Sequence, residues 1–130
     1  MRHIFLFILF SGFCLFAGFA QAEDMFFDSL YDVPVMEGLS EIPDQSFSFD
    51  KPDGRISQAA AVVASGTPKS AVFGFYDTAL GQMGWEKQEQ GIYTREGEKL
   101  TLSADEIPPK SQEKQGASLI IRFLLEPAQK

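Results

Sequence analysis

The sequence predicts an α+β fold of two layers, in which an antiparallel sheet carries one helix packed on one face. One long amphipathic segment has the start and stop signals of a helix, and short segments with strand signals lie on both sides of it. In chain order these segments read β-β-α-β-β-β. The roughly 108 residues after residue 22 are enough for one domain with its own core.

The predicted domain spans residues 46–126 and opens with a hairpin. Ser46-Phe47-Ser48-Phe49 alternates strictly between polar and apolar, which is typical of a half-buried strand. Lys51-Pro52-Asp53-Gly54 predicts a tight turn, and residues 55–64 predict the second strand. Small side chains on this strand would let the helix approach it closely: Ala59, Ala60, Ala61 and Ala64.

The helix is expected between Thr67, as its N-cap, and Gly84, as its C-terminal stop, with Pro68 at the first helical position. Apolar residues recur on it at intervals of three and four and predict one broad buried face. These residues are Val72, Phe75, Tyr76, Ala79, Leu80 and Met83.

Three short strands are predicted after the helix, over residues 85–88, 92–95 and 99–104, and they form an antiparallel meander. A polar loop with Pro108, Pro109 and Gly116 leads to a last strand over residues 117–125, which Pro127 ends. Leu119, Ile121, Phe123 and Leu125 are expected to face inward, while Ile120 and Leu124 on the other face indicate a central or partly covered strand.

The first 22 residues have the pattern of a cleavable export signal. Arg2 precedes an apolar run over residues 4–19, and Ala20-Gln21-Ala22 is a small-x-small cleavage site. We therefore expect cleavage after Ala22 and export to the periplasm, with no membrane span left in the mature chain. The alternative is that the apolar run stays attached as a membrane anchor.

Residues 23–45 read as an acidic N-terminal arm that is extended and packs its apolar residues against the domain. All 18 acidic residues follow Ala22, and residues 23–50 hold eight of them and no basic residue. This charge disfavours nucleic acid and anionic lipid as partners, and leaves a basic protein surface or simple solubility. Phe26, Phe27, Leu30 and Met36 are candidate partner-binding residues. The alternative is that they only cover one face of the sheet.

The mature chain lacks the residues of most hydrolytic sites. Its single histidine, His3, and its single cysteine, Cys14, both lie in the export signal. Without them the chain cannot form a Ser-His-Asp or Cys-His pair, nor a zinc site of nitrogen and sulfur ligands. We therefore expect no catalytic residue, no cofactor and no metal.

The candidates that remain each have a simpler interpretation. Residues 65–70 could supply a Ser-Lys pair, but serine and threonine at a helix start favour capping. Glu96 with Glu98, or Asp105 with Glu106, could act as paired carboxylates, but turns favour solvated charges. Two acidic sets could bind calcium but lack its loop pattern: Asp44, Asp50 and Asp53, or Asp24, Asp28 and Asp32. Phe75, Tyr76 and Trp85 could form a binding platform, but their spacing favours core packing.

Several short motifs occur in a specific order along the chain. They are Asp32-Val33-Pro34-Val35-Met36-Glu37-Gly38-Leu39, Gly54-Arg55-Ile56, Phe75-Tyr76, Gly84-Trp85 and Arg95-Glu96-Gly97-Glu98. On these motifs, over residues 32–126, the chain resembles a group of short exported uncharacterised proteins of Gram-negative bacteria, mostly alphaproteobacterial. No activity is known for that group. The resemblance implies a periplasmic address and one family-wide domain, and it brings no site residues.

Together these features predict a small non-catalytic exported domain that binds another envelope protein. The alternative is an enzyme based on carboxylates, or a small-ligand-binding protein, with a pocket between helix and sheet. A deep pocket that buries Glu96, Glu98 or Asp105 would favour the alternative.

Overall fold

A computed structural model describes residues 25–129 of the chain, except for the side chains of residues 113–115. The predicted export signal, its cleavage site and the alternative of an anchor lie outside the described residues. Between residues 25 and 129, no helix is both long and apolar enough to cross a membrane.

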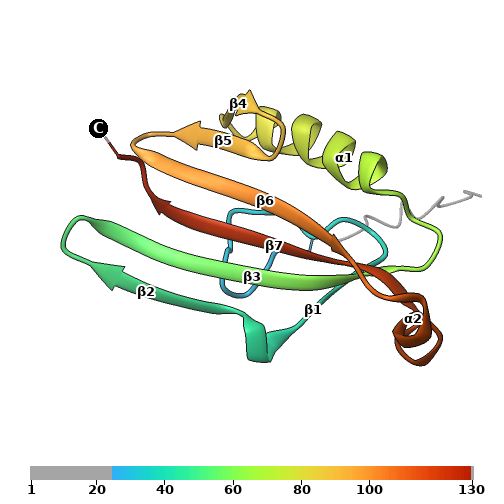
Figure 1. Cartoon of the computed structure of the whole chain (residues 1–130). Helices are drawn as coiled ribbons and strands as arrows, with labels where there is room; N and C mark the ends of the chain where they lie inside the picture. The colour runs from blue at the N-terminus through green and yellow to red at the C-terminus, as the bar shows by residue number, and fades with distance from the viewer. Residues whose placement is uncertain (1–24, 130) are drawn as a thin grey trace, which may run out of the picture.

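The fold is α+β, with an antiparallel sheet and one main helix, as the sequence predicts (Figure 1). Neighbouring strands follow the order β1-β3-β7-β6-β5-β4. β2 lies beside β1 on the same edge of β3: β1 pairs with the second half of β3, and β2 pairs with the first half. The elements are β1 (Leu39–Glu41), the 3-10 turn η1 (Pro43–Gln45), β2 (Phe47–Lys51), β3 (Gly54–Ala64), α1 (Lys69–Gln82), β4 (Glu86–Glu89), β5 (Ile92–Arg95), β6 (Glu98–Glu106), α2 (Pro109–Gln115) and β7 (Ala117–Pro127).

Three elements are not predicted by the sequence, and one of them is the 3-10 turn η1 at the end of the arm. Residues 109–115, expected to lie in a polar loop, form α2, because Pro109 is tolerated in the first helical turn and Gly116 ends the helix in the left-handed region (φ 61°). β1 lies inside the segment expected to be an arm, and pairs with Ala61–Val63 of β3. The predicted hairpin of β2 and β3 is confirmed, with Lys51 opposite Gly54 across the turn.

Helix α1 starts differently from the prediction. Pro68 rather than Thr67 is its N-cap residue, and no side chain caps the first turn. The expected N-cap at Thr67 is therefore wrong. Pro68 has an extended backbone (ψ 155°), so the helix begins at Lys69.

The end of α1 matches the prediction. Gly84 has a left-handed backbone (φ 88°) and donates its N–H to the Gly81 carbonyl, while the Trp85 N–H donates to the Leu80 carbonyl. This pair of hydrogen bonds is the Schellman arrangement, which favours glycine at this position. Leu80 and Trp85 are both buried, so the stop also fixes where the chain enters the core.

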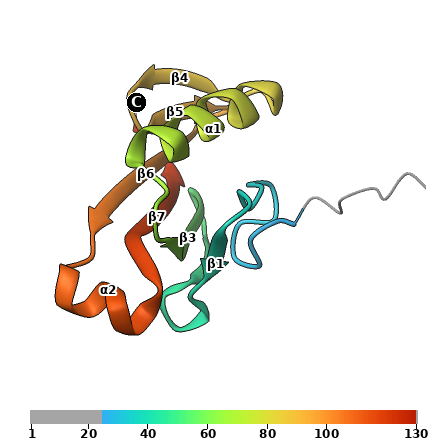
Figure 2. The ribbon, with the colours of Figure 1, turned by 90° about the vertical axis from the view of Figure 1, so that its right-hand side faces the viewer.

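One face of the sheet is covered by α1 and by the N-terminal arm (Figure 2). Val72, Tyr76 and Leu80 of α1 are fully buried, and the Tyr76 ring lies edge-on against Phe123 of β7 at 4.7 Å between centroids. Phe75, which was expected on the buried face, is partly exposed instead and meets Tyr76 in a T-shaped contact.

The described part of the arm belongs to the same core as the sheet. Phe27, Leu30 and Val33 are buried together with Ala59 and Ala61 of β3. Ala59 and Ala61 of β3 therefore share this layer with the arm, whereas Ala60 points to the opposite face and Ala64 is exposed, so the expected approach of the helix to all four small residues is wrong. The arm is anchored there, because the Ser29 hydroxyl donates to the Gln58 carbonyl of β3 (2.7 Å).

The arm is not extended throughout. Phe26 and Pro34 form an isolated antiparallel bridge, and the Val35 N–H donates to the Met25 carbonyl (2.6 Å). The segment therefore folds back on itself before it enters β1. The expectation that its apolar residues pack against the domain is confirmed by the burial of Phe27 and Leu30.

Candidate binding surface

The face of the sheet opposite α1 is covered by neither α1 nor most of the arm, and only Gln45 at the end of the arm contacts it, through Gln58 and Arg122 (Figures 1 and 2). Leu119, Ile121, Phe123 and Leu125 of β7 point to the covered face and are buried, as predicted. The alternate residues point to the uncovered face, and the strand register aligns them with those of β2 and β3. We call the apolar ones that are at least partly exposed the open-face patch: Phe47, Phe49, Ile56, Val62, Ile120 and Leu124.

Two phenylalanines of β2 dominate this patch. The Phe47 and Phe49 rings stack with 5.8 Å between centroids and 21° between planes, and the two residues are 43% and 49% exposed. Their alternation was predicted correctly, but the strand is exposed along its whole length rather than half-buried. The reason is that β2 is an edge strand beside a face that neither α1 nor the arm covers.

A cluster of four charged residues joins the arm to the sheet on the covered face. Arg55 of β3 and Arg95 of β5 both donate to Asp32 Oδ2 of the arm, at 2.9 and 2.6 Å. Arg55 also donates to both carboxylate oxygens of Glu98 in β6, with the shorter contact at 3.0 Å. All four side chains are largely buried.

Aromatic rings flank both guanidinium groups of this cluster. The Arg95 guanidinium lies 4.3 Å from the centroid of the buried Trp85 ring, and that of Arg55 lies 5.1 Å from the exposed Tyr31 ring. Burial acts to lower the pKa of Arg55, but its hydrogen bonds to Glu98 and Asp32 outweigh burial and raise that pKa. The cluster joins two guanidinium groups with two carboxylates.

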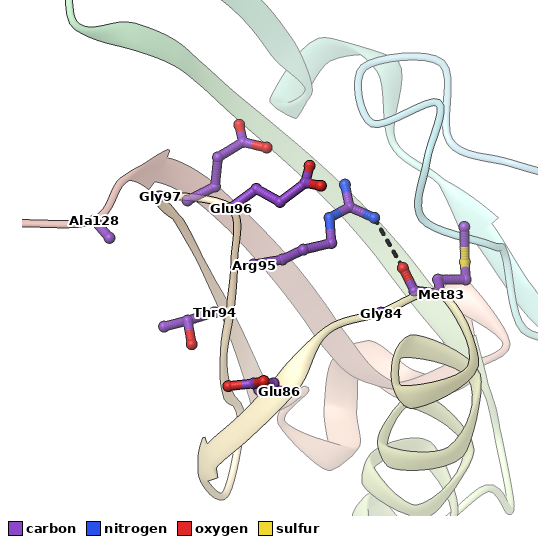
Figure 3. Close-up of a pocket in the computed structure, with 9 residues that line it drawn as sticks. Met83, Gly84, Glu86, Thr94, Arg95, Glu96, Gly97 and Ala128 are labelled. Atoms are coloured by element: carbon purple, nitrogen blue, oxygen red, sulfur yellow. Dashed lines mark hydrogen bonds between the residues drawn. The ribbon is translucent and has the colours of Figure 1, made fainter.

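A pocket of about 470 Å³ lies beside the cluster, at the turn between β5 and β6 (Figure 3). Arg95 reaches across it and donates to the Met83 carbonyl (3.2 Å). Three carboxylates line the pocket, from Glu86, Glu96 and Glu98.

The pocket brings together the pair of carboxylates that the sequence singled out, but it does not isolate them. Glu96 is exposed at the turn, in a left-handed backbone conformation (φ 47°), and Glu98 is hydrogen-bonded to Arg55. Asp105, the other candidate, has a side chain that is 71% exposed and pairs with Arg122. Each candidate carboxylate is therefore either exposed to solvent or hydrogen-bonded to an arginine, and none stands alone in an enclosed site.

Two buried tyrosines make polar contacts through their hydroxyl groups. Tyr76 donates to the Pro34 carbonyl (2.9 Å) and accepts from the Met36 N–H (3.2 Å), so α1 is fastened to the arm. Tyr93 of β5 donates to Asp77 of α1 (2.6 Å). Burial raises the pKa of Tyr76, and burial together with the Asp77 carboxylate raises the pKa of Tyr93.

The four residues predicted to bind a partner fall into two groups. Phe27 and Leu30 are core residues with 1% exposure or less, which corrects their assignment as partner anchors, because a folded chain cannot offer them. Phe26 is exposed, and Met36 is partly buried against the core. Partner binding through Phe26 and Met36 stays a prediction.

The other candidate sites are dispersed in the structure. Tyr76 and Trp85 are core residues, as expected. Lys69 and Ser70 line a second open pocket of about 600 Å³, and Thr67, which also lines it, caps nothing. Within the part of the chain that the structure describes, no three His, Cys, Asp or Glu residues gather as a metal site.

The chain matches no protein-family model, no curated protein sequence and no solved structure. The resemblance to short exported bacterial proteins therefore stays a prediction. The charged cluster was missed in the sequence, because Asp32 lies 23 residues from Arg55 and 63 from Arg95. For Phe47 and Phe49, strict alternation indicated a shared face but not that this face is open.

Proposed function

We propose that the protein is a non-catalytic binding module of the periplasm, which holds another envelope protein against the open face of its sheet. The observation that carries this proposal is the stacked, exposed pair of Phe47 and Phe49 on the uncovered face. Exposed aromatic residues beside other apolar side chains are typical of protein interfaces.

The chemistry around the patch supports a polypeptide as the partner. The open-face patch is a strand surface with apolar side chains rather than a deep cavity, which suits a protein or an extended peptide. Acidic groups outnumber basic ones around it: Asp44, Asp50 and Asp53 lie at its border with Lys51, and Arg122 on the same face is paired with Asp105, so a nucleic acid or an anionic lipid surface would be repelled.

A carboxylate enzyme is the second candidate, and one observation favours it: Glu96 and Glu98 line the same pocket. Two others count against it, because Glu98 is hydrogen-bonded to Arg55 and Glu96 is exposed at a turn. Neither carboxylate lies in an apolar environment of the kind that creates a catalytic acid. Binding is therefore the better supported function.

Photo-crosslinking in the cells that make the protein tests the proposal. A photoreactive phenylalanine analogue replaces Phe47 or Phe49, and in the control it replaces Phe75, which is also exposed but lies on α1. We expect discrete adducts with another envelope protein from Phe47 and Phe49 only. Absence of such adducts, or equal adducts from Phe75, would contradict the proposal.

The periplasmic address is tested separately by intact mass. Cleavage after Ala22 predicts a mature chain that begins at Glu23 and is released by osmotic shock. A chain that still begins at Met1 and sediments with the inner membrane would contradict this part of the proposal.

A further inference from the structure

One edge of the sheet offers backbone groups that the rest of the described chain does not use. β2 forms this edge, pairs only with β3 among the described strands, and all five of its residues are exposed. Natural edge strands of this kind are usually shortened, covered or charged, because they pair readily with another strand. Here β2 is charged only at its C-terminal end, at Asp50 and Lys51, and two exposed phenylalanines precede these residues.

The hydrogen bonds identify which residues of β2 point their backbone outward. The backbone of Ala60 in β3 points toward the edge where β1 and β2 lie: its carbonyl accepts the Ile42 N–H, and its N–H donates to Ser46 Oγ. Because backbone direction alternates along a strand, the other even-numbered residues of β3 point the same way. Register places Phe47, Phe49 and Lys51 opposite even-numbered residues.

Because hydrogen-bonded and non-bonded pairs alternate in an antiparallel ladder, the intervening residues Ser48 and Asp50 direct their N–H and C=O groups to the free edge. The 2.6 Å contact between the Ser48 and Ser57 hydroxyls agrees with this parity, since side chains approach closest in non-bonded pairs.

The two faces of an added strand would meet different chemistry. On the open face its side chains would lie beside Phe47 and Phe49, with Lys51 at the end of the strand, and on the other face beside Ser48 and Asp50. No described residue pairs with the Asp50 carboxylate, and Asp44 and Asp53 add negative charge at the two ends of the strand. Apolar residues suit the first face and basic residues the second.

We infer that the partner binds by adding an extended segment to β2, and that this segment alternates apolar residues with lysine or arginine. This inference rests on the proposed function and specifies its partner. A second copy of the chain is a poorer occupant. Antiparallel pairing of Phe47 with Phe49 of the copy would place Ser46, rather than a cation, opposite Asp50, and two chains of like net charge would approach each other.

Synthetic heptapeptides test the inference by fluorescence anisotropy with the mature protein. The probe alternates lysine and valine, and its matched controls carry serine or glutamate in place of lysine. We expect affinity to fall in the order lysine, serine, glutamate, with about tenfold or more between the first and the last. Equal affinities, or no binding of the lysine peptide, would overturn the inference.

Backbone methylation of the peptide separates strand addition from mere charge attraction. In an antiparallel addition the lysine N–H groups face Ser48 and Asp50, and in a parallel addition the valine N–H groups do so. One of the two N-methylated series is therefore expected to abolish binding. Binding that tolerates both series would overturn strand addition, while the proposed use of the open face, tested by crosslinking, would stand.

Variants of the protein supply the reciprocal test. Ser48→Pro removes an N–H that points to the free edge and that β3 does not use. Ser48→Ala is its control: both variants lose the hydroxyl contact with Ser57, but only the proline variant loses the N–H. Only the proline variant should fail to bind the lysine peptide. Trp85 fluorescence checks that both variants are folded. Asp50→Lys should weaken the lysine peptide and admit the glutamate peptide. Equal binding by all variants, or a dimer that forms without peptide, would overturn the inference.

Discussion

Asp32 holds two guanidinium groups at once, because Arg55 and Arg95 donate to the same carboxylate oxygen. Only 15% of its side chain is exposed, so solvent can replace little of what this carboxylate provides. Asp32→Asn keeps the shape of the side chain and removes its charge. The two guanidinium groups of Arg55 and Arg95 then have only the Glu98 carboxylate as a nearby negative charge. We expect a loss of about 1–3 kcal/mol in the free energy of unfolding, less than for a fully buried pair.

Urea denaturation followed by Trp85 fluorescence measures this loss. Asp44→Asn is the matched control, because Asp44 is exposed and its carboxylate pairs with no described residue; its effect should stay within about 0.5 kcal/mol. Equal stability of the two variants would mean that the cluster contributes nothing to holding the arm.

Asp77 makes stability depend on acid pH. Burial acts to raise the pKa of Asp77, but the hydrogen bond from Tyr93 and the ion pair with Lys87 outweigh it and hold that pKa below its ordinary value of 3.8. A carboxylate whose pKa is lowered by folding stabilises the protein above its unfolded pKa, and this contribution is lost as pH falls through the folded pKa.

The advantage of the natural chain over Asp77→Asn should therefore be constant from neutral pH down to about pH 5 and should shrink below about pH 4. Chemical denaturation at stepped pH values checks this. A difference between the two proteins that persists unchanged to pH 2 would contradict the assignment.

At the scale of elements, the arm is a structural layer of the fold. Phe27 lies in the core against Phe123, with 5.5 Å between ring centroids, whereas its neighbour Phe26 is exposed. Phe27→Ala should lower the free energy of unfolding by about 3–5 kcal/mol, because a large buried ring is removed. Phe26→Ala is the control and should change it by less than about 1 kcal/mol.

Thermal melting and urea denaturation of both variants measure these effects. Deletion of residues 23–31 should act in the same direction as Phe27→Ala, since it also removes Leu30 from the core. A truncated protein that melts like the intact one would mean that the arm only decorates a domain that folds without it.

The sequence predicted the elements that have local signals and missed those that depend on distant partners. Gly84 marked the end of α1, and alternation marked the inward residues of β7, because both patterns lie within one segment. The half-buried strand at Phe47 and Phe49 was wrong, since what covers a face is decided by a segment far away in sequence.

The charged cluster shows the same limit at the candidate site. Asp28 and Asp32, taken alone, indicate only an acidic set that could bind calcium. The structure instead gives Asp32 two arginines from separate strands, and lets the Glu41 carboxylate accept the Asp28 N–H and the Ser29 hydroxyl. Pairing across 23 and 63 residues leaves no periodic signal in the sequence.

At the scale of the whole molecule, part of the acidic excess of the N-terminal segment is neutralised internally and part is displayed. Asp32 is paired with arginines of the sheet, whereas Asp44 and Asp50 remain exposed around β2. Part of the negative charge available to a partner therefore lies beside the free edge, next to the strand that carries the open-face phenylalanines.

The stability of the whole molecule should also fall in alkali, through two tyrosines that fasten separate parts of it. Tyr76 ties α1 to the arm and Tyr93 ties β5 to α1, and burial raises the pKa of both above the ordinary value of 10.0. A phenol that ionises only in the unfolded chain stabilises the protein fully below its unfolded pKa, and this contribution is lost as pH rises toward the folded pKa.

Above about pH 10, two such groups should therefore lower the free energy of unfolding by about 2.7 kcal/mol per pH unit, twice the value for a single proton. Tyr76→Phe should lower stability at neutral pH, because the Pro34 carbonyl and the Met36 N–H lose their partner, and should also halve the alkaline slope. Tyr31→Phe is the control, since Tyr31 is exposed and does not fasten α1 or β5 to another part of the molecule. Urea denaturation between pH 9 and pH 11.5 measures the slopes.

A slope that is the same in Tyr76→Phe as in the natural chain would show that Tyr76 ionises as readily in the folded protein as in the unfolded one. The proposal that a neutral hydroxyl fastens α1 to the arm would then be wrong.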